Sequence, residues 1–157
     1  MTEPVAPALE LLFRAHVELG EVLEIGEVEP GRRQRTIPIA GGTFEGPGLR
    51  GTILPGGADW QVVLPDGTAL IDTRYALRTH DGEPIDVRTQ GFRAGPPEVL
   101  AALAAGDRVV APSEYYFRVR VLLTSAAPGL RWLNNLLVVA SAVRTAEAVV
   151  YDAYAVR

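Results

Sequence analysis

Residues 68–79, TALIDTRYALRT, decide the fold, because apolar and polar side chains alternate along them. The odd-numbered positions, such as Ile71 and Tyr75, are mainly apolar, whereas the even-numbered positions carry the charges. This period-two pattern is typical of a β-strand with one buried and one polar face. Asp-Gly pairs at 66–67 and 81–82 flank the strand. They favour type I′ hairpin turns, which need a positive φ at both central residues.

The alternation continues along the rest of the chain. Apolar side chains share one face of residues 9–19, and further strand-length runs are rich in β-branched or aromatic residues: 35–40, 58–64, 84–90, 114–124, 136–144 and 146–156. The last two runs are predicted to pair as a hairpin across Thr145. One segment differs. Pro96-Pro97-Glu98 followed by VLAALAAG predicts a helix of two or three turns that ends at Gly106.

These elements predict an all-β fold in a single domain spanning residues 1–157. Sixteen glycines and twelve prolines separate the runs at strand-length intervals, as in antiparallel β proteins. We expect about nine strands and one short helix, arranged as a barrel or a sandwich. The barrel is favoured, because closure leaves no exposed strand edges.

Composition excludes several kinds of chemistry. The chain has no cysteine, its 15 basic residues are all arginine, and it has only two histidines, His16 and His80. Thiolate metal sites, a cysteine nucleophile, a Schiff-base lysine and a Walker-type phosphate site are therefore excluded. Both histidines are expected to be exposed to solvent. We expect no metal and no cofactor.

Charge and hydropathy restrict the partners. A net charge of -4 argues against nucleic acid as a partner, because nucleic-acid binders concentrate a basic excess. No apolar run is long enough for a membrane helix, and the N-terminus lacks the pattern of a signal peptide. We expect a cytoplasmic protein that does not bind membranes. The apolar hairpin at 136–156 favours self-association, as a dimer.

Several motifs resemble those of a known family when they are taken in order. They are GGTFEGP at 41–47 with Gly51, LPGGADW at 54–60, IDTRY at 71–75 with HDG at 80–82, YYFR at 115–118 and WLN at 132–134. Together they resemble the small bacterial and fungal domain-of-unknown-function family numbered thirty-two thirty-seven, from about residue 9 to the end. The P-G-G-x-D-W segment is the most specific of them. The resemblance implies an antiparallel, calycin-like β-barrel with a pocket inside, and it implies little about chemistry.

Asp59 and Trp60 follow the glycine pair Gly56-Gly57, which we interpret as a tight turn or bulge. Adjacent strand residues point to opposite faces, so one of the two should line the interior. An inward Asp59 would be a buried carboxylate with a raised pKa, suited to acid or base catalysis. Alternatively, its carboxylate caps backbone amides of the turn. Trp60 is a candidate substrate-binding residue.

Asp72 and Arg74 share the charged face of the strand at 68–79. Either they form a surface ion pair, or this face turns into the cavity. In the second case the carboxylate and the guanidinium would converge on a ligand. We place Asp72 first among the catalytic candidates, with Arg74 and Tyr75 as substrate-binding residues.

Two aromatic and polar pairs complete the candidate site. Tyr116 and Arg118 share a strand face, and the Tyr116 phenol could donate a proton or hydrogen bond to a developing oxyanion. Alternatively, it packs with its hydroxyl at the rim. Trp132 and Asn134 lie two residues apart on a segment expected to be extended, where they could recognise an aromatic ligand. Alternatively, Trp132 plugs one end of the barrel.

The sequence therefore favours a cofactor-independent acid/base enzyme. It would be a lyase, isomerase or cyclase acting on a small, largely apolar oxygenated metabolite. Asp72, Asp59 and Tyr116 are its catalytic candidates. The alternative is a non-catalytic barrel that binds a small hydrophobic ligand. Asp and Tyr oxygens converging within about 3 Å would favour catalysis, and an entirely apolar interior would favour binding.

Overall fold

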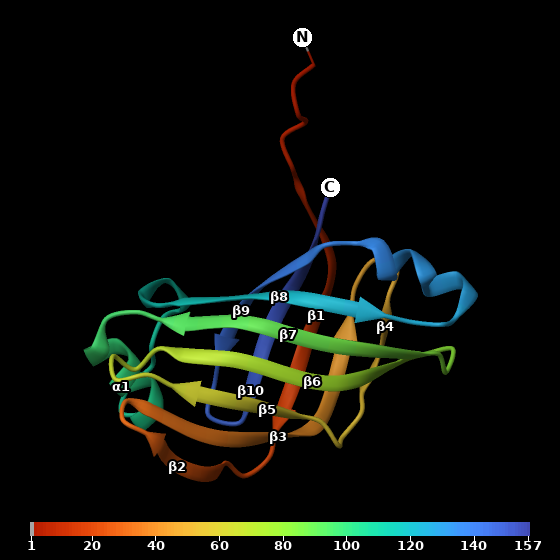
Figure 1. Cartoon of the computed structure of the whole chain (residues 1–157). Coiled ribbons are helices and arrows are strands. Elements are labelled where there is room, and N and C mark those ends of the chain that lie inside the picture. Colours follow the sequence, from red (N-terminus) through yellow and green to blue (C-terminus); the bar gives the residue numbers. More distant parts are fainter. Residues whose placement is uncertain (1) are drawn as a thin grey trace.

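The computed structural model describes residues 2–157, which fold into a closed antiparallel β-barrel (Figure 1). The described residues contain ten strands: β1 (Leu9–Leu19), β2 (Leu23–Glu29), β3 (Arg32–Glu45), β4 (Arg50–Ile53), β5 (Ala58–Val63), β6 (Ala69–Thr79), β7 (Pro84–Ala94), β8 (Tyr116–Thr124), β9 (Val138–Arg144) and β10 (Ala148–Val156). From β1 the strands follow the order β10, β9, β8, β7, β6, and β3 closes the ring by pairing with β1. The predicted all-β barrel is confirmed.

Eight strand positions make up the ring, because β4 and β5 share one of them. β4 pairs with the second half of β3, β5 pairs with its first half, and both pair with β6. Residues 54–57 interrupt this shared position, and β2 is added outside the ring, where it pairs with β3 alone. The strand runs anticipated from sequence did not include β2 and β4. Strand β4 is short, and residues 23–29 are mainly exposed.

The short helix is confirmed as α1 (Pro97–Ala105), with Pro97 in its first turn and Gly106 in a left-handed conformation at its end. It packs against the β5–β6 turn, where Leu100 lies beside Gly67. Two 3-10 helices were not anticipated: η1 (Pro112–Glu114) and η2 (Pro128–Asn135). The extended conformation expected around Trp132 is therefore wrong. Pro128 fixes a helical φ at the start of η2 instead.

The hairpins at 66–67 and 81–82 form, but not with type I′ turns. Within residues 2–157, only glycines have a positive φ, including Gly67 at 87° and Gly82 at 89°. In each turn one glycine is left-handed and the aspartate before it is not. The Asp66 carboxylate instead accepts the amide of Thr68 at 2.9 Å, so the aspartate stabilises the turn through its side chain.

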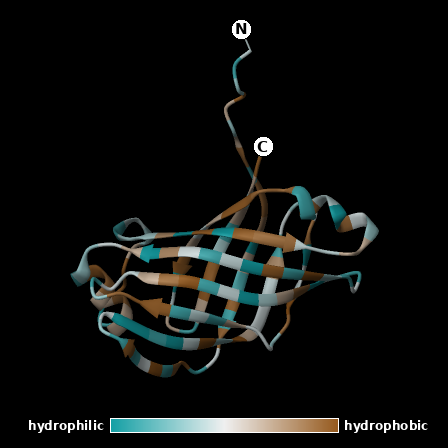
Figure 2. Cartoon of the chain, viewed as in Figure 1, coloured by the Kyte–Doolittle hydropathy of each residue, from teal (hydrophilic) through white to brown (hydrophobic). Residues whose placement is uncertain are grey.

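The wall of the barrel alternates between an apolar inner face and a polar outer face, visible as banding along the strands in Figure 2. On β6 the side chains of Ala69, Ile71, Thr73, Tyr75 and Leu77 are buried. The alternation shifts in β1, where a register irregularity lies between Leu11 and Phe13. Leu9 and Leu11 are exposed as a result, although sequence periodicity placed them on the face of Phe13.

The part of the chain that the structure describes, residues 2–157, contains neither a membrane-spanning helix nor a metal-binding cluster. None of its helices combines the length and the apolar character needed to cross a membrane. Nor does it contain a group of three or more histidine, aspartate or glutamate side chains arranged to hold a metal ion.

Candidate functional site

A cavity of about 50 Å³ lies inside the barrel. Most of its wall is aliphatic or aromatic, and the polar side chains on it are Asp59, Gln61, Thr73, Tyr75, Thr89, Arg93, Arg144 and Tyr151. A volume of this size holds a few water molecules or a small group of atoms, because an apolar cavity that binds benzene measures about 150 Å³. The cavity is neither fully apolar nor large, and its chemistry depends on these polar groups.

Among the residues that the structure describes, Asp59 is the only carboxylate on the cavity wall. It is 7% exposed, and both of its oxygens are engaged. Oδ1 accepts the amide N–H of Asp72 at 3.0 Å, and Oδ2 accepts Nε2 of Gln61 at 2.9 Å. Burial raises the pKa of Asp59, although these hydrogen bonds and the charge of Arg93 act in the opposite direction. Asp59 therefore has the inward placement, and the amide that it accepts comes from β6 and not from the glycine turn, as the alternative interpretation had it.

The glycine turn before Asp59 determines which way it points. Gly56 has a φ of 112°, which favours glycine. At Gly57, a Cβ atom would lie 2.1 Å from the carbonyl oxygen of Arg74, so the turn approaches β6 too closely for any side chain. The P-G-G motif is therefore structural, as interpreted, and it holds β5 in the register that pairs Asp59 with Thr73.

Gln61 connects Asp59 to an arginine. Its side chain is almost fully buried at 1% exposure, and its Oε1 accepts Nε of Arg35 at 2.7 Å. The Arg35 guanidinium thus polarises the amide that donates to Asp59. Burial lowers the pKa of Arg35, partly offset by Glu24. The chain of contacts from Arg35 through Gln61 fixes the orientation of the Asp59 carboxylate.

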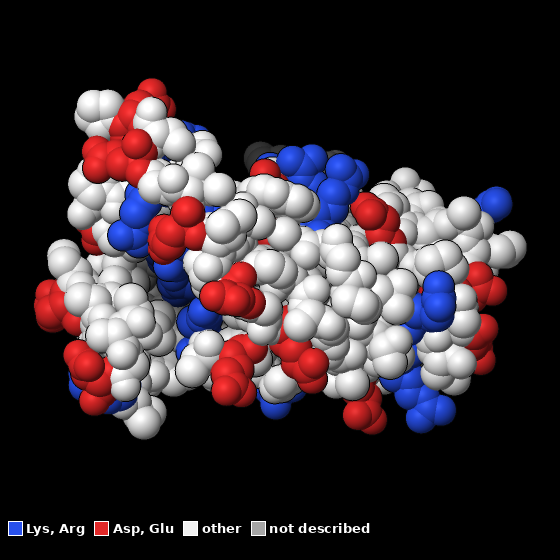
Figure 3. All heavy atoms as spheres, turned by 90° about the horizontal axis from the view of Figure 1, so that it is seen from below, with Lys and Arg blue, Asp and Glu red and all other residues white. Residues whose placement is uncertain are grey.

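Arg93 at the end of β7 and Arg144 at the end of β9 complete the polar part of the wall. The Arg93 guanidinium lies over the ring of Phe117, 5.6 Å from its centroid. Burial, together with the charges of Arg144 and Arg35, lowers the pKa of Arg93 to about 10. Burial likewise lowers the pKa of Arg144. Figure 3 shows arginine side chains inside a hollow on the left, the side on which α1 lies in Figure 1.

Tyr75 and Tyr151 meet inside the barrel, where their hydroxyls are hydrogen-bonded to each other. Burial raises the pKa of Tyr75 well above its ordinary value and raises that of Tyr151 to about 12. Both phenols are therefore neutral at physiological pH. Among the residues described, neither hydroxyl is hydrogen-bonded to Asp59, so the Asp–Tyr pair that would favour catalysis is not formed by these groups.

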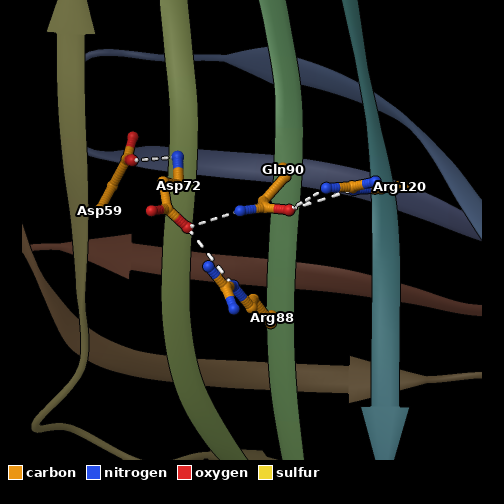
Figure 4. A network of polar contacts seen from close by, with 5 residues as sticks. All are labelled: Asp59, Asp72, Arg88, Gln90 and Arg120. Atoms are coloured by element: carbon orange, nitrogen blue, oxygen red, sulfur yellow. Dashed lines mark hydrogen bonds and ion pairs between the residues drawn. The ribbon is translucent and has the colours of Figure 1, made fainter.

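Asp72 and Arg74 lie on the outer face, and their expected position in the cavity is wrong. The Asp72 side chain is 48% exposed and contacts Arg88 at 3.6 Å. Gln90 donates to Asp72 at 3.3 Å and accepts from Arg120, so a polar network crosses β6, β7 and β8 (Figure 4). The reason is that odd-numbered and even-numbered side chains of β6 point to opposite faces of the sheet. The apolar face of the strand must fill the small interior, so its charged face meets water.

Three further candidates also project outward. Trp60 is 53% exposed and Tyr116 is 54% exposed, and the Arg118 guanidinium lies over the Tyr116 ring. Each has the opposite parity to a buried neighbour, Asp59 or Phe117, on the same strand. The structure does not bring these side chains to the cavity.

Trp132 and Asn134 lie on η2, away from the cavity lining. Trp132 is 45% exposed and donates from its indole to the carbonyl of Gly129. The Asn134 side chain accepts the amide of Ser125 at 2.8 Å and donates to its carbonyl at 3.0 Å. Asn134 thus fixes the loop after β8, and a shared ligand-binding role for the pair has no support in this geometry.

Gln61, Arg93 and Arg144 were missed in the sequence, although strand parity could have found them. Gln61 is two residues from Asp59, and Arg93 has the parity of the buried Thr89 on β7. Arg144 has the parity of buried alanines on β9. The signal for all three is a polar or charged residue, near the end of a strand, on the same face as the buried residues of that strand.

Comparison with known proteins places the chain in a family. The model of the family described as "Protein of unknown function (DUF3237)" matches residues 7–156. The UPF0311 protein RPA1785 of Rhodopseudomonas palustris is 38% identical over 154 residues, which cover 97% of this chain and 99% of that protein. The crystal structure of a β-barrel-like protein from Acinetobacter baumannii is 44% identical, with a TM-score of 0.88 and full coverage of both chains.

A more distant structure shares the fold. A protein from Penicillium herquei, described as an enzyme, has a TM-score of 0.74 and 22% identity, covering 100% of this chain and 99% of that one. Sequence, fold and full-length coverage agree for the nearer relatives. The chain therefore belongs to the DUF3237 family of proteins of unknown function, as its motifs indicated.

Proposed function

We propose that this protein is a cofactor-independent acid/base enzyme with Asp59 as its proton-transferring group. The observation that carries the proposal is a single buried carboxylate in a mainly apolar cavity, opposed by two arginines. Burial raises the pKa of Asp59, and a carboxylate with a raised pKa is a stronger base for proton transfer. The substrate would be a small, largely apolar oxygenated metabolite.

The arginines supply the complementary part of the proposed mechanism. Removal of a proton next to a carbonyl leaves an enolate, whose negative charge needs stabilisation. Strands β5 and β9 lie four positions apart in the eight-position ring, so Asp59 and Arg144 face each other across the interior. Asp59 would take the proton while Arg93 or Arg144 binds the oxygen. Return of the proton to another carbon gives an isomer. Attack of the enolate carbon on a second carbonyl group of the same molecule closes a ring, and the proton then goes to the oxygen of that carbonyl. Expulsion of a leaving group from the carbon next to the enolate, with the proton passed to that group, gives a lyase reaction.

The same geometry assigns no catalytic part to the tyrosine pair. Tyr75 and Tyr151 bond to each other and are neutral, so in this proposal they close the inner part of the cavity. The description of the Penicillium herquei protein as an enzyme agrees with the proposal, although at 22% identity the likeness carries only the fold.

Incubation with a fractionated bacterial metabolite extract, followed by chromatography and mass spectrometry, tests the proposal. An isomerase or cyclase shifts a compound to a new retention time at unchanged mass, and a lyase splits one compound into two. The conversion should require Asp59, so Asp59→Asn should abolish it. The matched control is Asp86→Asn, which changes an exposed carboxylate on the outer face of β7. Conversion that survives Asp59→Asn would refute the proposed role.

A non-catalytic binding barrel is the second candidate, and the mainly aliphatic cavity wall favours it. In that case a compound from the extract would be retained by the protein and released unchanged on denaturation. Its recovery would be the same with the wild-type chain and with Asp86→Asn, and no new compound would form.

A further inference from the structure

Two guanidinium groups on the cavity wall, those of Arg93 and Arg144, have no carboxylate within ion-pair distance among the described residues, although the charge of Asp59 acts on both. Within residues 2–157, ion pairs engage seven arginines, and neither Arg93 nor Arg144 is among them. Their guanidinium groups make no side-chain hydrogen bond in this part of the chain either, and the closest partner of Arg93 is the face of Phe117. Both side chains are half-buried on the cavity wall. An arginine withdrawn from water is usually paired, so this pair needs an explanation.

The charge balance inside the barrel points to an anion. Arg35, Arg93 and Arg144 repel one another. Glu24 balances Arg35, which leaves Asp59 as the one carboxylate among the described wall residues to balance Arg93 and Arg144. Gln61 already occupies Arg35, whereas Arg93 and Arg144 keep their donors available. A positive surplus in a poorly hydrated site is unfavourable, and a bound anion relieves it.

We propose that Arg93 and Arg144 bind the carboxylate of a small organic acid, whose apolar body extends into the barrel. The planar fork of a guanidinium matches a carboxylate through two parallel hydrogen bonds. Beyond the arginines the wall is formed by side chains such as Ile37, Ile71 and Val119, which suit a short aliphatic chain. The cavity volume of about 50 Å³ sets the upper size of that chain.

This inference deepens the proposed function, because it names the substrate class for the same cavity. The claim that this acid is a substrate rests on the proposed function. The claim that the acid binds does not, since a carboxylate can bind without reacting. The anion would lie between Arg93 on β7, two ring positions from the strand of Asp59, and Arg144 on β9, four positions from it.

Binding of propanoate, whose two-carbon chain suits a cavity of this size, tests the inference, with propanamide as its neutral counterpart of equal shape. Isothermal titration calorimetry should give at least about tenfold tighter binding for the acid, the scale of one charge-assisted interaction. Arg93→Gln and Arg144→Gln should each remove that preference for the acid over the amide. Arg78→Gln, on the outer face of β6, is the matched control and should behave as the wild type.

Folding is checked by thermal unfolding without ligand, where loss of a buried, unpaired cation should not lower the Tm. If Arg93→Gln is unfolded, Arg93→Lys keeps the charge and loses the fork, so its preference for the acid should be intermediate. Equal affinity for acid and amide in the wild type would overturn the inference. So would an unchanged preference in both folded glutamine variants, or tighter binding of inorganic phosphate than of the acid.

Asp59→Asn separates this inference from the proposed function. It removes a negative charge near the arginines, so it should bind propanoate at least as tightly as the wild type. Acid-selective binding together with metabolite conversion that survives Asp59→Asn would refute the acid/base role and leave the carboxylate site standing. Conversion that depends on Asp59 without acid-selective binding would refute the carboxylate site alone.

Discussion

Asp59 and Asp72 lie on opposite faces of one sheet, yet a hydrogen bond joins them. The backbone amide of Asp72 donates to Oδ1 of Asp59 at 3.0 Å, while the Asp72 carboxylate points outward to Arg88 (Figure 4). The neighbouring pairs of β5 and β6 are Asp59–Thr73 and Val62–Leu70, so the carboxylate bonds to an amide between two paired sites. The backbone amide of Asp72 thus holds a carboxylate of the interior, while its side chain lies on the outer surface.

Replacing the Asp72 side chain should therefore change little. Asp72→Asn keeps the amide and alters an exposed carboxylate, so the free energy of unfolding should change by less than about 1 kcal/mol. Asp59→Asn should lower turnover by roughly a hundredfold or more, the usual scale for losing a general acid or base. Urea unfolding and the metabolite-conversion assay measure the two effects. A hundredfold loss of turnover in Asp72→Asn would contradict this assignment.

Stability should fall with rising pH because of Asp59. Its pKa is raised in the folded state, so the folded protein holds this proton more tightly than the unfolded chain does. Its contribution is fully present below the unfolded value of about 3.9 and is lost as pH rises through the folded pKa. We expect Asp59→Asn to remove this decline. The check is the difference in unfolding free energy between the two proteins across acidic to neutral pH, and a constant difference would contradict it.

The tyrosine pair should show strong coupling. Tyr75→Phe or Tyr151→Phe alone leaves one buried hydroxyl without its partner, which costs about 1–3 kcal/mol of stability. The double variant leaves no unpaired hydroxyl, so its loss should be well below the sum of the two. A double-mutant cycle by chemical denaturation measures the coupling energy. Additive losses would show that the hydroxyls do not depend on each other.

The same pair should resist ionisation. The pKa of Tyr151 is raised to about 12 and that of Tyr75 is also raised. A raised tyrosine pKa means that stability is lost as pH rises above the unfolded value of about 10. Near-ultraviolet titration should show two of the five tyrosines ionising only as the protein unfolds. The Tyr75→Phe/Tyr151→Phe variant should lack this late step, and its presence there would contradict the assignment.

The glycine turn provides a stability test. Gly57→Ala places a Cβ atom 2.1 Å from the Arg74 carbonyl, so β5 must move, at a cost of at least about 2 kcal/mol. Gly129→Ala is the matched control, because its Cβ would meet no atom within 4 Å. Thermal unfolding of both variants measures the contrast. Equal Tm values would mean that the turn tolerates a side chain.

Sequence periodicity was sufficient for the barrel and insufficient for the site. Alternation along residues 68–79 separated the faces of β6 correctly, with Ile71 and Tyr75 on the buried one. The error lay in turning the charged face inward. A small eight-position barrel has room for apolar side chains and a few polar ones, so the charges of Asp72 and Arg74 belong in water. Parity separates the faces, and interior volume decides which one is inside.

Other features depend on contacts between distant segments. The irregularity after Leu11 reverses the facing of the first residues of β1, and it arises from pairing with β10. The grouping of Arg35, Arg93 and Arg144 requires three strands from different parts of the chain to end at one side of the barrel. Local periodicity carries neither piece of information, because both depend on how the ring closes.

The length of the turn at residues 54–57 determines which side chains of β5 face the cavity, because alternate residues of a strand point to opposite faces. Deleting or adding one residue there would rotate the phase of β5 and exchange its two faces. Trp60 would then enter the interior, while Asp59 and Gln61 would face the solvent. A loop that touches no ligand thereby sets whether the barrel presents an acid or an indole to whatever it holds. A change in loop length, with every side chain kept, would be enough to give this barrel a different chemistry.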